Sequence, residues 1–582
     1  MRESRSEVVR VNGSLAEVSV MSDVALYELV RVGERGLLGE VIRIERDVAT
    51  VQVFEETMGM SLGEEVLRTG RTLLAQLGPG LLGRTIDGIG RPLEELAGRE
   101  GDWIVPGTTA RMLSTDAEWN FVKGLKAGAV VQPGDILGTV VEQADFEHRI
   151  MVPFGVRGEI DSIEDGLFTV DQPICRLKDG TELCLFQEWP VRVRRPIERR
   201  LTGNRPFLTG QRIFDFFFPV AEGGAVAVPG GFGTGKTVIE QSLAKFADAD
   251  VVVYVACGER GNEAADVLEE FAELVDPRTG RSVSSRAVMV VNTSNMPVAA
   301  RDASVYLGMT IAEYFRDMGY RVAVMADSLS RWAEALREVS AKLEDMPGEE
   351  GYPTYLGGRL SQLVERAGRA KACGKPRREG TVTFVSAISP PGGDFSEPVT
   401  RASLQVSGAL WALDPNLAHS RHFPAVDWGT SYTLYEGALE EWFKEQGYED
   451  WVELRGALLQ LLERDQELRE IAGLIGVDAM EDKDRVVLDV VRILRDAVMT
   501  QSAFDANDAF SSIDKTFGLA KLVKAAYDAA VFSIESGTAL SQLDLASVSR
   551  ALMAVRAAAP ETVMAEFANA RAAVTKMREG VG

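Results

Sequence analysis

Eight consecutive residues match the phosphate-loop pattern of glycine, any four residues and Gly-Lys-Thr: Gly230, Gly231, Phe232, Gly233, Thr234, Gly235, Lys236 and Thr237. Glycines let the backbone curl around phosphate groups without a Cβ in the way, and successive N–H groups can point at one anion. In such a loop Lys236 reaches the β- and γ-phosphates of a nucleotide, and Thr237 places its hydroxyl on Mg²⁺. The alternative is a glycine turn that only joins a strand to a helix.

The sequence on both sides favours the phosphate loop over a plain turn. Residues 225–228 form a short apolar run that predicts a buried strand. Residues 238–246 carry apolar side chains at helical spacing, beginning with Val238 beside the loop. A loop between such elements lies at the positive end of the helix dipole, where phosphate binds.

A carboxylate follows another apolar run. Residues 322–326 predict a buried strand, and Asp327 stands at its carboxyl end. This is the arrangement in which an aspartate holds Mg²⁺, here through a water molecule. One carboxylate after one strand is a weak signal alone, but it gains weight in the same domain as a phosphate loop.

A second acidic segment follows the apolar strand predicted at 251–257. Phosphoryl transfer to water needs a group that orients the water and positive charge for the transition state. We expect Glu259 to polarise the attacking water and Arg260 to contact the γ-phosphate. The alternative is an acidic helix N-terminus, which suits Glu263 better than Glu259.

Strands and helices alternate in the sequence from 191 to 435 and would position these residues. This alternation predicts a doubly wound parallel α/β domain, in which ligands bind at the carboxyl ends of the strands. The expected strands are 251–256, 286–293, 321–326 and 381–388, and the expected helices include 263–276 and 297–318.

The remaining sequence predicts four further segments. Residues 1–70 read as short strands of a small β-barrel, 71–110 as an irregular lead-in, 111–190 as a strand-rich insertion and 436–582 as a helical bundle. In the bundle, one apolar stripe comprises Leu454, Leu458, Leu461, Leu462, Leu468 and Ile471.

Composition argues against nucleic-acid binding, a His or Cys metal site, and a membrane-spanning or secreted protein. The formal charge of −24 disfavours nucleic acid as a partner. Three histidines and four cysteines without paired metal-ligand spacing make a His or Cys metal site improbable. No apolar stretch reaches transmembrane length, and the first nine residues lack an apolar signal core, so we expect a cytosolic protein.

Together, 230–237, 258–263 and Asp327 resemble the catalytic subunits of rotary ATPases. The phrase FPAVDWGTSYT at 423–433 resembles a signature of these subunits, with Thr433 where serine is usual. The 111–190 block, the run 218–220 and Phe232 are similar to the catalytic A subunit (alpha chain) of V/A-type ATPases, and the similarity covers essentially the whole chain. Eukaryotic members tend to carry cysteine where Thr234 stands, so thiol regulation is not expected.

The resemblance implies that three such chains alternate with three B subunits around a central stalk, with a peripheral stalk and a membrane rotor ring. The complex would couple ATP hydrolysis or synthesis to proton or sodium transport, with Mg²⁺, from the cytoplasmic face of the cell membrane. The resemblance also implies that Phe423 stacks on adenine and Phe504 closes that pocket. Either could equally be an ordinary core aromatic.

Three rivals stay open at this point. A Rho-like RNA translocase would need a basic channel and base-stacking aromatics in its barrel. A secretion or flagellar export ATPase should lack the 111–190 block. A non-catalytic structural role is disfavoured by the presence of Lys236 and Glu259.

Overall fold

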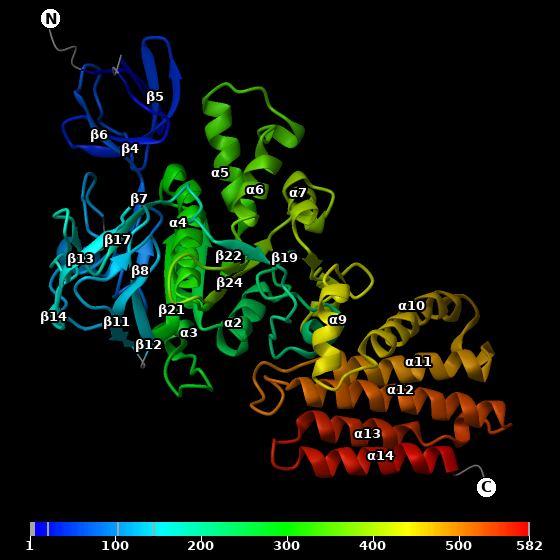
Figure 1. Ribbon diagram of the computed structural model, residues 1–582. Helices are drawn as coiled ribbons and strands as arrows, with labels where there is room; N and C mark the ends of the chain where they lie inside the picture. The colour runs from blue at the N-terminus through cyan, green and yellow to red at the C-terminus, as the bar shows by residue number, and fades with distance from the viewer. Residues whose placement is uncertain (1–5, 20–22, 102–103, 144–145, 580–582) are drawn as a thin grey trace, which may run out of the picture. The chain divides into compact units, whose positions relative to one another are not determined.

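The structure is a computed structural model that describes residues 6–19, 23–101, 104–143 and 146–579 (Figure 1). The expectation about a signal segment falls partly on residues 1–5, which lie outside the described residues. The chain divides into two compact units. The first comprises 1–201, 249–390 and 394–406, and the second comprises 202–248, 391–393 and 407–582.

The first unit begins with an antiparallel barrel, as the sequence predicts. Its strands are ordered β1-β2-β5-β4-β3-β6, and hydrogen bonds from Val8 N to Glu64 O (2.9 Å) and Val66 N to Ser6 O (2.8 Å) close the sheet. Alternate side chains such as Val18, Val30 and Val51 fill the interior. The strands are β1 (Val8–Asn12), β2 (Leu15–Ser19), β3 (Glu28–Val32), β4 (Leu37–Glu45), β5 (Val48–Val53) and β6 (Val66–Thr72).

The strand-rich insertion forms two four-stranded sheets, β10-β13-β15-β16 and β12-β11-β9-β14, around a shared apolar core. Its strands are β9 (Trp119–Lys123), β10 (Val130–Val131), β11 (Ile136–Glu142), β12 (Phe146–Met151), β13 (Gly158–Ile163), β14 (Gly166–Phe168), β15 (Cys175–Leu177) and β16 (Glu182–Leu183). Cys175, Cys184, Cys257 and Cys373 are free thiols.

The parallel sheet of the first unit runs in the order β24-β22-β20-β21-β8. These strands are β20 (Val251–Cys257), β21 (Ala287–Asn292), β22 (Arg321–Asp327), β24 (Glu379–Ile388) and β8 (Thr85–Asp87). Every residue of β20 is buried, which explains its unbroken apolar sequence. Three further pairs are antiparallel: β23 (Gly368–Lys371) with β24, β23 with β18 (Arg199–Leu201), and β17 (Gln187–Pro190) with β7 (Leu74–Leu77).

Helices cover this sheet, and α4 packs against β20, β21, β22 and β24. The helices of the first unit are α1 (Leu93–Glu100), α3 (Gly261–Glu273), α4 (Val298–Asp317), α5 (Leu329–Lys342), α6 (Leu356–Val364) and α7 (Pro398–Val406). The segment 71–110 is less irregular than its sequence indicates, because it contains β7, β8 and α1. β8 is only three residues long, and its pairing with β21 is not a local property of its sequence.

The second unit contains β19 (Ala225–Pro229), which pairs in parallel with β25 (Ala409–Leu410), and β25 pairs with β26 (Tyr432–Thr433). A π-helical turn, η2 (Ile213–Phe217), precedes β19. The first helices are α2 (Lys236–Phe246), α8 (Pro415–His419) and α9 (Glu436–Glu445).

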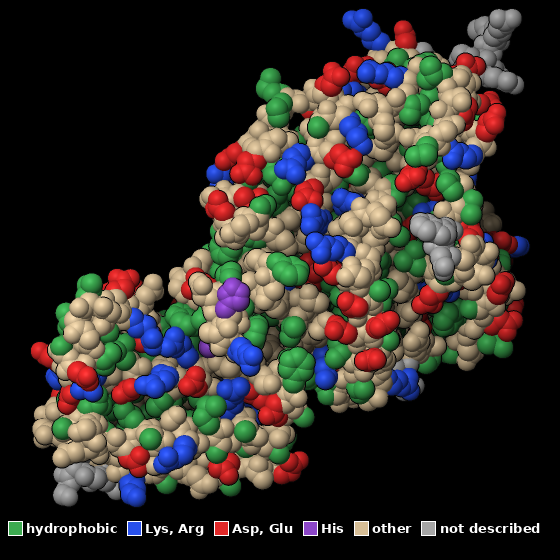
Figure 2. All heavy atoms as spheres, turned by 180° about the vertical axis from the view of Figure 1, so that it is seen from behind, with side chains coloured by type: hydrophobic (Ala, Val, Ile, Leu, Met, Phe, Trp, Pro, Cys, Tyr) green, Lys and Arg blue, Asp and Glu red, His purple; other side chains and the backbone are tan. Residues whose placement is uncertain are grey.

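The helical bundle is confirmed, and its long helices pack side by side (Figure 1). They are α10 (Trp451–Ile475), α11 (Asp482–Leu494) with its π-helical end η7 (Arg495–Met499), α12 (Ile513–Glu535), α13 (Leu545–Ala557) and α14 (Val563–Glu579). Figure 2 shows acidic and basic side chains interspersed over the bundle surface.

One member of the predicted apolar stripe differs from expectation. Leu454, Leu458, Leu461, Leu462 and Leu468 are buried, whereas Ile471 is 41% exposed. The reason is that the last turns of α10 extend past its packed part, so that Leu474 is also exposed. Within the described residues, no helix is both long and apolar enough to cross a membrane.

Candidate functional site

The phosphate-loop residues connect β19 to α2 in the second unit. Gly233 and Gly235 have φ angles of 76° and 88°, in the left-handed region that favours glycine. A Cβ added to Gly230 would lie 2.6 Å from Thr234 Oγ1 and 2.8 Å from Leu413 Cβ. The loop therefore needs glycine at these positions for its backbone path and its close packing.

Polar side chains gather on this loop at the start of α2. Lys236 Nζ donates hydrogen bonds to the carbonyl oxygens of Gly230 (2.5 Å) and Gly231 (3.1 Å). Thr234 Oγ1 donates to the Gly231 carbonyl over 2.9 Å, and Thr237 lies in the first turn of the helix. Phe232 projects from the loop and is 94% exposed. An ammonium and a hydroxyl thus stand together where the helix dipole favours an anion.

A cavity of about 310 Å³ adjoins the loop within the second unit. Its wall brings together five residues that the sequence assigns to the nucleotide: Thr234, Gly235, Val238, Phe423 and Phe504. The other lining residues are Gln211, Ile239, Ser242, Arg421, Pro424, Thr500, Gln501, Ser502, Ala503 and Arg556.

The two aromatic residues differ in exposure. A Cβ added to Gly235 would lie 3.5 Å from the Phe423 ring, which shows that this ring packs against the loop. Phe423 is 39% exposed and Phe504 is 97% exposed, so neither is an ordinary core aromatic. Exposed aromatic faces in a mostly apolar cavity are suited to stacking on a planar base.

The acidic residues lie in the first unit, at the carboxyl ends of adjacent strands. Ala256 of β20 pairs with Asp327 of β22, so Glu259, two residues beyond β20, follows the same sheet edge. Gly258 N donates to Asn292 O over 2.6 Å, and Ser294 N donates to Glu259 O over 2.7 Å. These bonds hold the backbone that presents Glu259.

The surroundings of Glu259 favour its neutral form. Burial raises the pKa of this carboxyl to about 8, and the nearby charges of Asp327 and Glu263 add to the rise, while Arg331 opposes it. Tyr254 donates a hydrogen bond from its hydroxyl to Asp327 Oδ2 over 3.4 Å. A perturbed carboxyl at the ligand edge of a parallel sheet is typical of a proton-transfer site.

The arginines near Glu259 include one that the sequence analysis missed. The Arg260 side chain is 70% exposed and lies 3.8 Å from Glu263, so it is held loosely. Arg331, in the first turn of α5, packs against Gly258. A Cβ added to Gly258 would lie 2.6 Å from the Cβ of Arg331. The sequence signal that could have identified Arg331 is its position one helical turn after Asp327.

Four family models match consecutive parts of the chain. The nucleotide-binding domain of the ATP synthase alpha/beta family matches residues 210–433, and the beta-barrel domain of the same family matches 8–70. The barrel-sandwich domain of ATP synthase alpha/beta subunits matches 110–192. The C-terminal domain of V and A type ATP synthase matches 440–543.

The chain is similar to ATP synthase subunits along nearly its whole length. It is 50% identical to an A-type ATP synthase subunit of Methanospirillum hungatei over 92% of each chain. It is 48% identical to the V-type ATP synthase alpha chain of Acetivibrio thermocellus, covering 93% of this chain and 92% of the relative.

A solved structure of the assembled ATPase EscN from the enteropathogenic E. coli type III secretion system shares the fold. The TM-score is 0.66 at 21% identity, covering 89% of this chain and 99% of EscN. The much higher identity to the ATP synthase chains distinguishes between the branches that the sequence left open. The chain belongs to the family of V-type ATP synthase alpha chains and their A-type ATP synthase counterparts.

Proposed function

We propose that the phosphate loop, the aromatic cavity and the Glu259 segment together carry the chemistry of a nucleotide-hydrolysing and nucleotide-synthesising subunit. The chain is the catalytic subunit of a V/A-type rotary ATPase, which couples ATP hydrolysis or synthesis to ion transport across a membrane. The observation that carries the site proposal is the single cavity that joins Thr234, Gly235 and Val238 of the loop and helix to Phe423 and Phe504.

In this proposal the second unit binds the nucleotide. The backbone of residues 230–235 and the Lys236 ammonium hold the β- and γ-phosphates, as the glycine conformations and the position of Nζ permit. Val238, Phe423 and Phe504 bind the adenine by apolar contact and stacking.

The first unit acts on water. Glu259 accepts, in its ionised form, a proton from the water that attacks the γ-phosphate, and in synthesis it returns that proton. Its raised pKa suits both tasks, because a group with a pKa near the working pH can take up and release a proton. Arg260 contributes positive charge at the γ-phosphate, and Arg331 favours the ionised form of Glu259.

The donor set fits Mg²⁺, which prefers hard oxygen ligands and keeps several waters. Thr237 would supply its hydroxyl, and Asp327 its carboxylate through water. Bound Mg²⁺ would neutralise charge on the phosphate oxygens. Such a site needs no large cluster of protein ligands, and within the described residues no group of three or more His, Cys, Asp or Glu side chains could hold a metal.

The chain is part of a multi-subunit complex. We propose the arrangement that the family implies: three copies alternate with three B subunits, with central and peripheral stalks and a membrane rotor ring that carries protons or sodium ions. The headpiece would lie at the cytoplasmic face of the cell membrane. We propose domain limits of 1–70, 71–110, 111–190, 191–435 and 436–582.

The isolated chain tests this proposal. If a B subunit supplies an arginine to the γ-phosphate, the chain alone should bind ATP but hydrolyse it slowly, because such arginines contribute about 10³- to 10⁵-fold. The measurement is ATP turnover of the purified chain before and after addition of its B partner. A large increase supports the proposal, whereas full turnover by a verified monomer contradicts it.

A further inference from the structure

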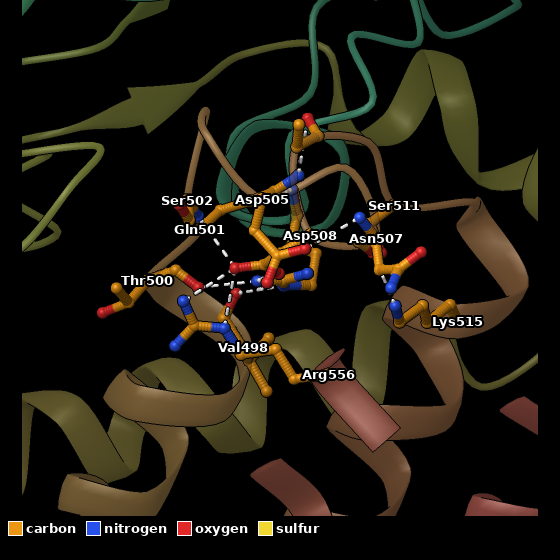
Figure 3. Close-up of polar contacts among 12 residues, drawn as sticks. Val498, Thr500, Gln501, Ser502, Asp505, Asn507, Asp508, Ser511, Lys515 and Arg556 are labelled. Atoms are coloured by element: carbon orange, nitrogen blue, oxygen red, sulfur yellow. Dashed lines mark hydrogen bonds and ion pairs between the residues drawn. The ribbon is translucent and has the colours of Figure 1, made fainter. Parts of the chain in front are cut away.

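Residues 500–511, which we name the cover segment, join η7 to α12 and carry side chains with opposite environments. Phe504 is 97% exposed and lines the aromatic cavity, whereas Asp508 is 2% exposed. Figure 3 shows Asp508 among polar side chains from the cover segment, from Lys515 of α12 and from Arg556 of α13.

Asp508 forms ion pairs with two arginines from distant parts of the sequence. Its Oδ1 lies 2.7 Å from Nη2 of Arg212, which directly precedes η2. Its Oδ2 accepts a hydrogen bond from Nε of Arg556 over 2.8 Å (Figure 3). The same oxygen accepts from Ser502 N over 2.8 Å, so Asp508 also closes the cover segment on itself.

The two arginines hold the backbone that leads into the cover segment. Arg212 donates from Nε to Val498 O (3.0 Å) and from Nη2 to Thr500 O (2.6 Å). Arg556 donates from Nη1 to Asp496 O over 2.6 Å. Arg212 and Arg556 therefore hold the start of the cover segment through backbone carbonyls and its later part through Asp508.

Gln501 connects the same network to the Phe423 side of the cavity. Its Oε1 accepts from Arg212 N over 2.8 Å, and its Nε2 donates to Gly210 O over 2.8 Å. Its own backbone N–H donates to Phe423 O over 2.7 Å. The two aromatic residues of the cavity are thus linked through Gln501 and Arg212.

Asp508 supplies the negative charge that balances the arginines of this cluster. Burial opposes its ionisation, but Arg212 and Arg556 lower the pKa of Asp508 overall. Arg212 and Arg556 contact this buried carboxylate, and Lys515, which donates to Asn507 O and Ala558 O, is influenced by its charge without a direct contact. A buried ion pair is weak evidence for stability, but it can specify one geometry.

We propose that Asp508 is a positioning residue for nucleotide binding: with Arg212 and Arg556 it fixes the cover segment so that Phe504 is placed to stack on the base. This inference rests on the proposed base-binding role of the cavity. Asp508 and Arg212 do not line the cavity, whereas Arg556 does, so the effect of Asp508 on affinity should follow that of Phe504.

The test uses isothermal titration of the full chain with Mg·ADP and, separately, with Mg·tripolyphosphate, which lacks a base. The variants are Asp508→Asn, Arg556→Gln, Phe504→Ala and the double variant Phe504→Ala/Asp508→Asn. Asp505→Asn is the matched control, because it removes the same charge from an exposed position of the cover segment. We expect each single test variant to weaken ADP about tenfold, as for loss of one base–aromatic stack, and to leave tripolyphosphate unchanged.

The double variant should bind ADP no more weakly than Phe504→Ala, because both changes remove the same stacking interaction between Phe504 and the base. If Asp508→Asn and Arg556→Gln bind ADP like the wild type while Phe504→Ala does not, the positioning role is wrong and the base cavity stands. An equal loss for ADP and tripolyphosphate also overturns it. If Phe504→Ala has no effect, the base cavity fails and the positioning role with it. Should Asp508→Asn not fold, Arg556→Gln, at a 15% exposed side chain, carries the test together with the double variant Phe504→Ala/Arg556→Gln. Because Arg556 also lines the cavity, a positioning role predicts that the double variant binds ADP no more weakly than Phe504→Ala, whereas an added loss would mean direct contact with the base.

Discussion

Lys236 donates a hydrogen bond from Nζ to the carbonyl oxygen of Gly230 over 2.5 Å. The bond holds the ammonium over the loop whose backbone N–H groups would receive phosphate. The first turn of α2 therefore offers a fixed positive charge next to the loop N–H groups, which is the arrangement that phosphate binding requires.

Replacing this lysine should weaken nucleotide binding without unfolding the chain. Lys236→Ala removes a charge-assisted contact of about 1.5–3 kcal/mol, equivalent to a loss of roughly 10- to 150-fold in affinity. Titration with Mg·ADP and circular dichroism measure the two effects. Lys245→Ala, in the last turn of the same helix, is the control and should bind normally. Normal binding by Lys236→Ala would disprove the phosphate-loop assignment.

The backbone at Gly258 should be as important as the side chain that follows it. Gly258 has a φ of 77°, and a Cβ there would meet Arg331 Cβ at 2.6 Å. Gly258→Ala should destabilise the first unit by roughly 1–2 kcal/mol and lower turnover, because it displaces Glu259 or Arg331. Gly261→Ala is the control, since an added Cβ there meets no neighbouring atom within 4 Å. Equal turnover in the two variants would contradict this account of the loop.

The raised pKa of Glu259 predicts a pH-dependent stability difference. The carboxyl has a pKa of about 8 in the folded chain, against its ordinary value of 4.5 in the unfolded chain. The folded state holds this proton more tightly, so the wild type loses stability as pH rises through this window. Glu259→Gln lacks this titratable group. The Tm of the variant minus the Tm of the wild type should therefore be larger at about pH 8.5 than at about pH 6.

Scanning calorimetry at both pH values measures this gain. Glu269→Gln, on the exposed side of α3, is the matched control and should follow the wild type. A Tm difference that does not change with pH would mean that Glu259 is ionised throughout the window.

Much of the proposed site could be located from sequence because its signals are local. The phosphate loop, Asp327 and Glu259 each lie within a few residues of an apolar strand, and strand ends determine where they go. Phe504 had no local signal and came only from the family resemblance. Asp508 and Arg212 were missed because their pairing joins segments that are far apart in the sequence. β8 was missed for the same reason, since its partner β21 is distant.

The insertion is attached to the α/β core through a buried histidine. His148 of β12 contacts Glu142 Oε2 through Nδ1 (2.7 Å) and the Tyr314 hydroxyl through Nε2 (2.8 Å). His148→Ala should destabilise the first unit by about 1–3 kcal/mol for each polar group left unpaired. Denaturant unfolding measures this loss, and nucleotide affinity should be unchanged. Glu147→Ala, whose side chain is 52% exposed, is the control. A loss no larger than that of the control would mean that the contacts do not stabilise the unit.

Glu259→Gln tests the central claim most directly, because it keeps the side-chain shape and removes only the base. The measurement is steady-state ATP hydrolysis by the assembled complex, paired with Mg·ADP titration of the same variant. We predict that turnover falls about 10²- to 10⁴-fold, the usual contribution of a general base, while nucleotide affinity stays at the wild-type value. Turnover close to that of the wild type would contradict the account and make Glu259 a structural residue.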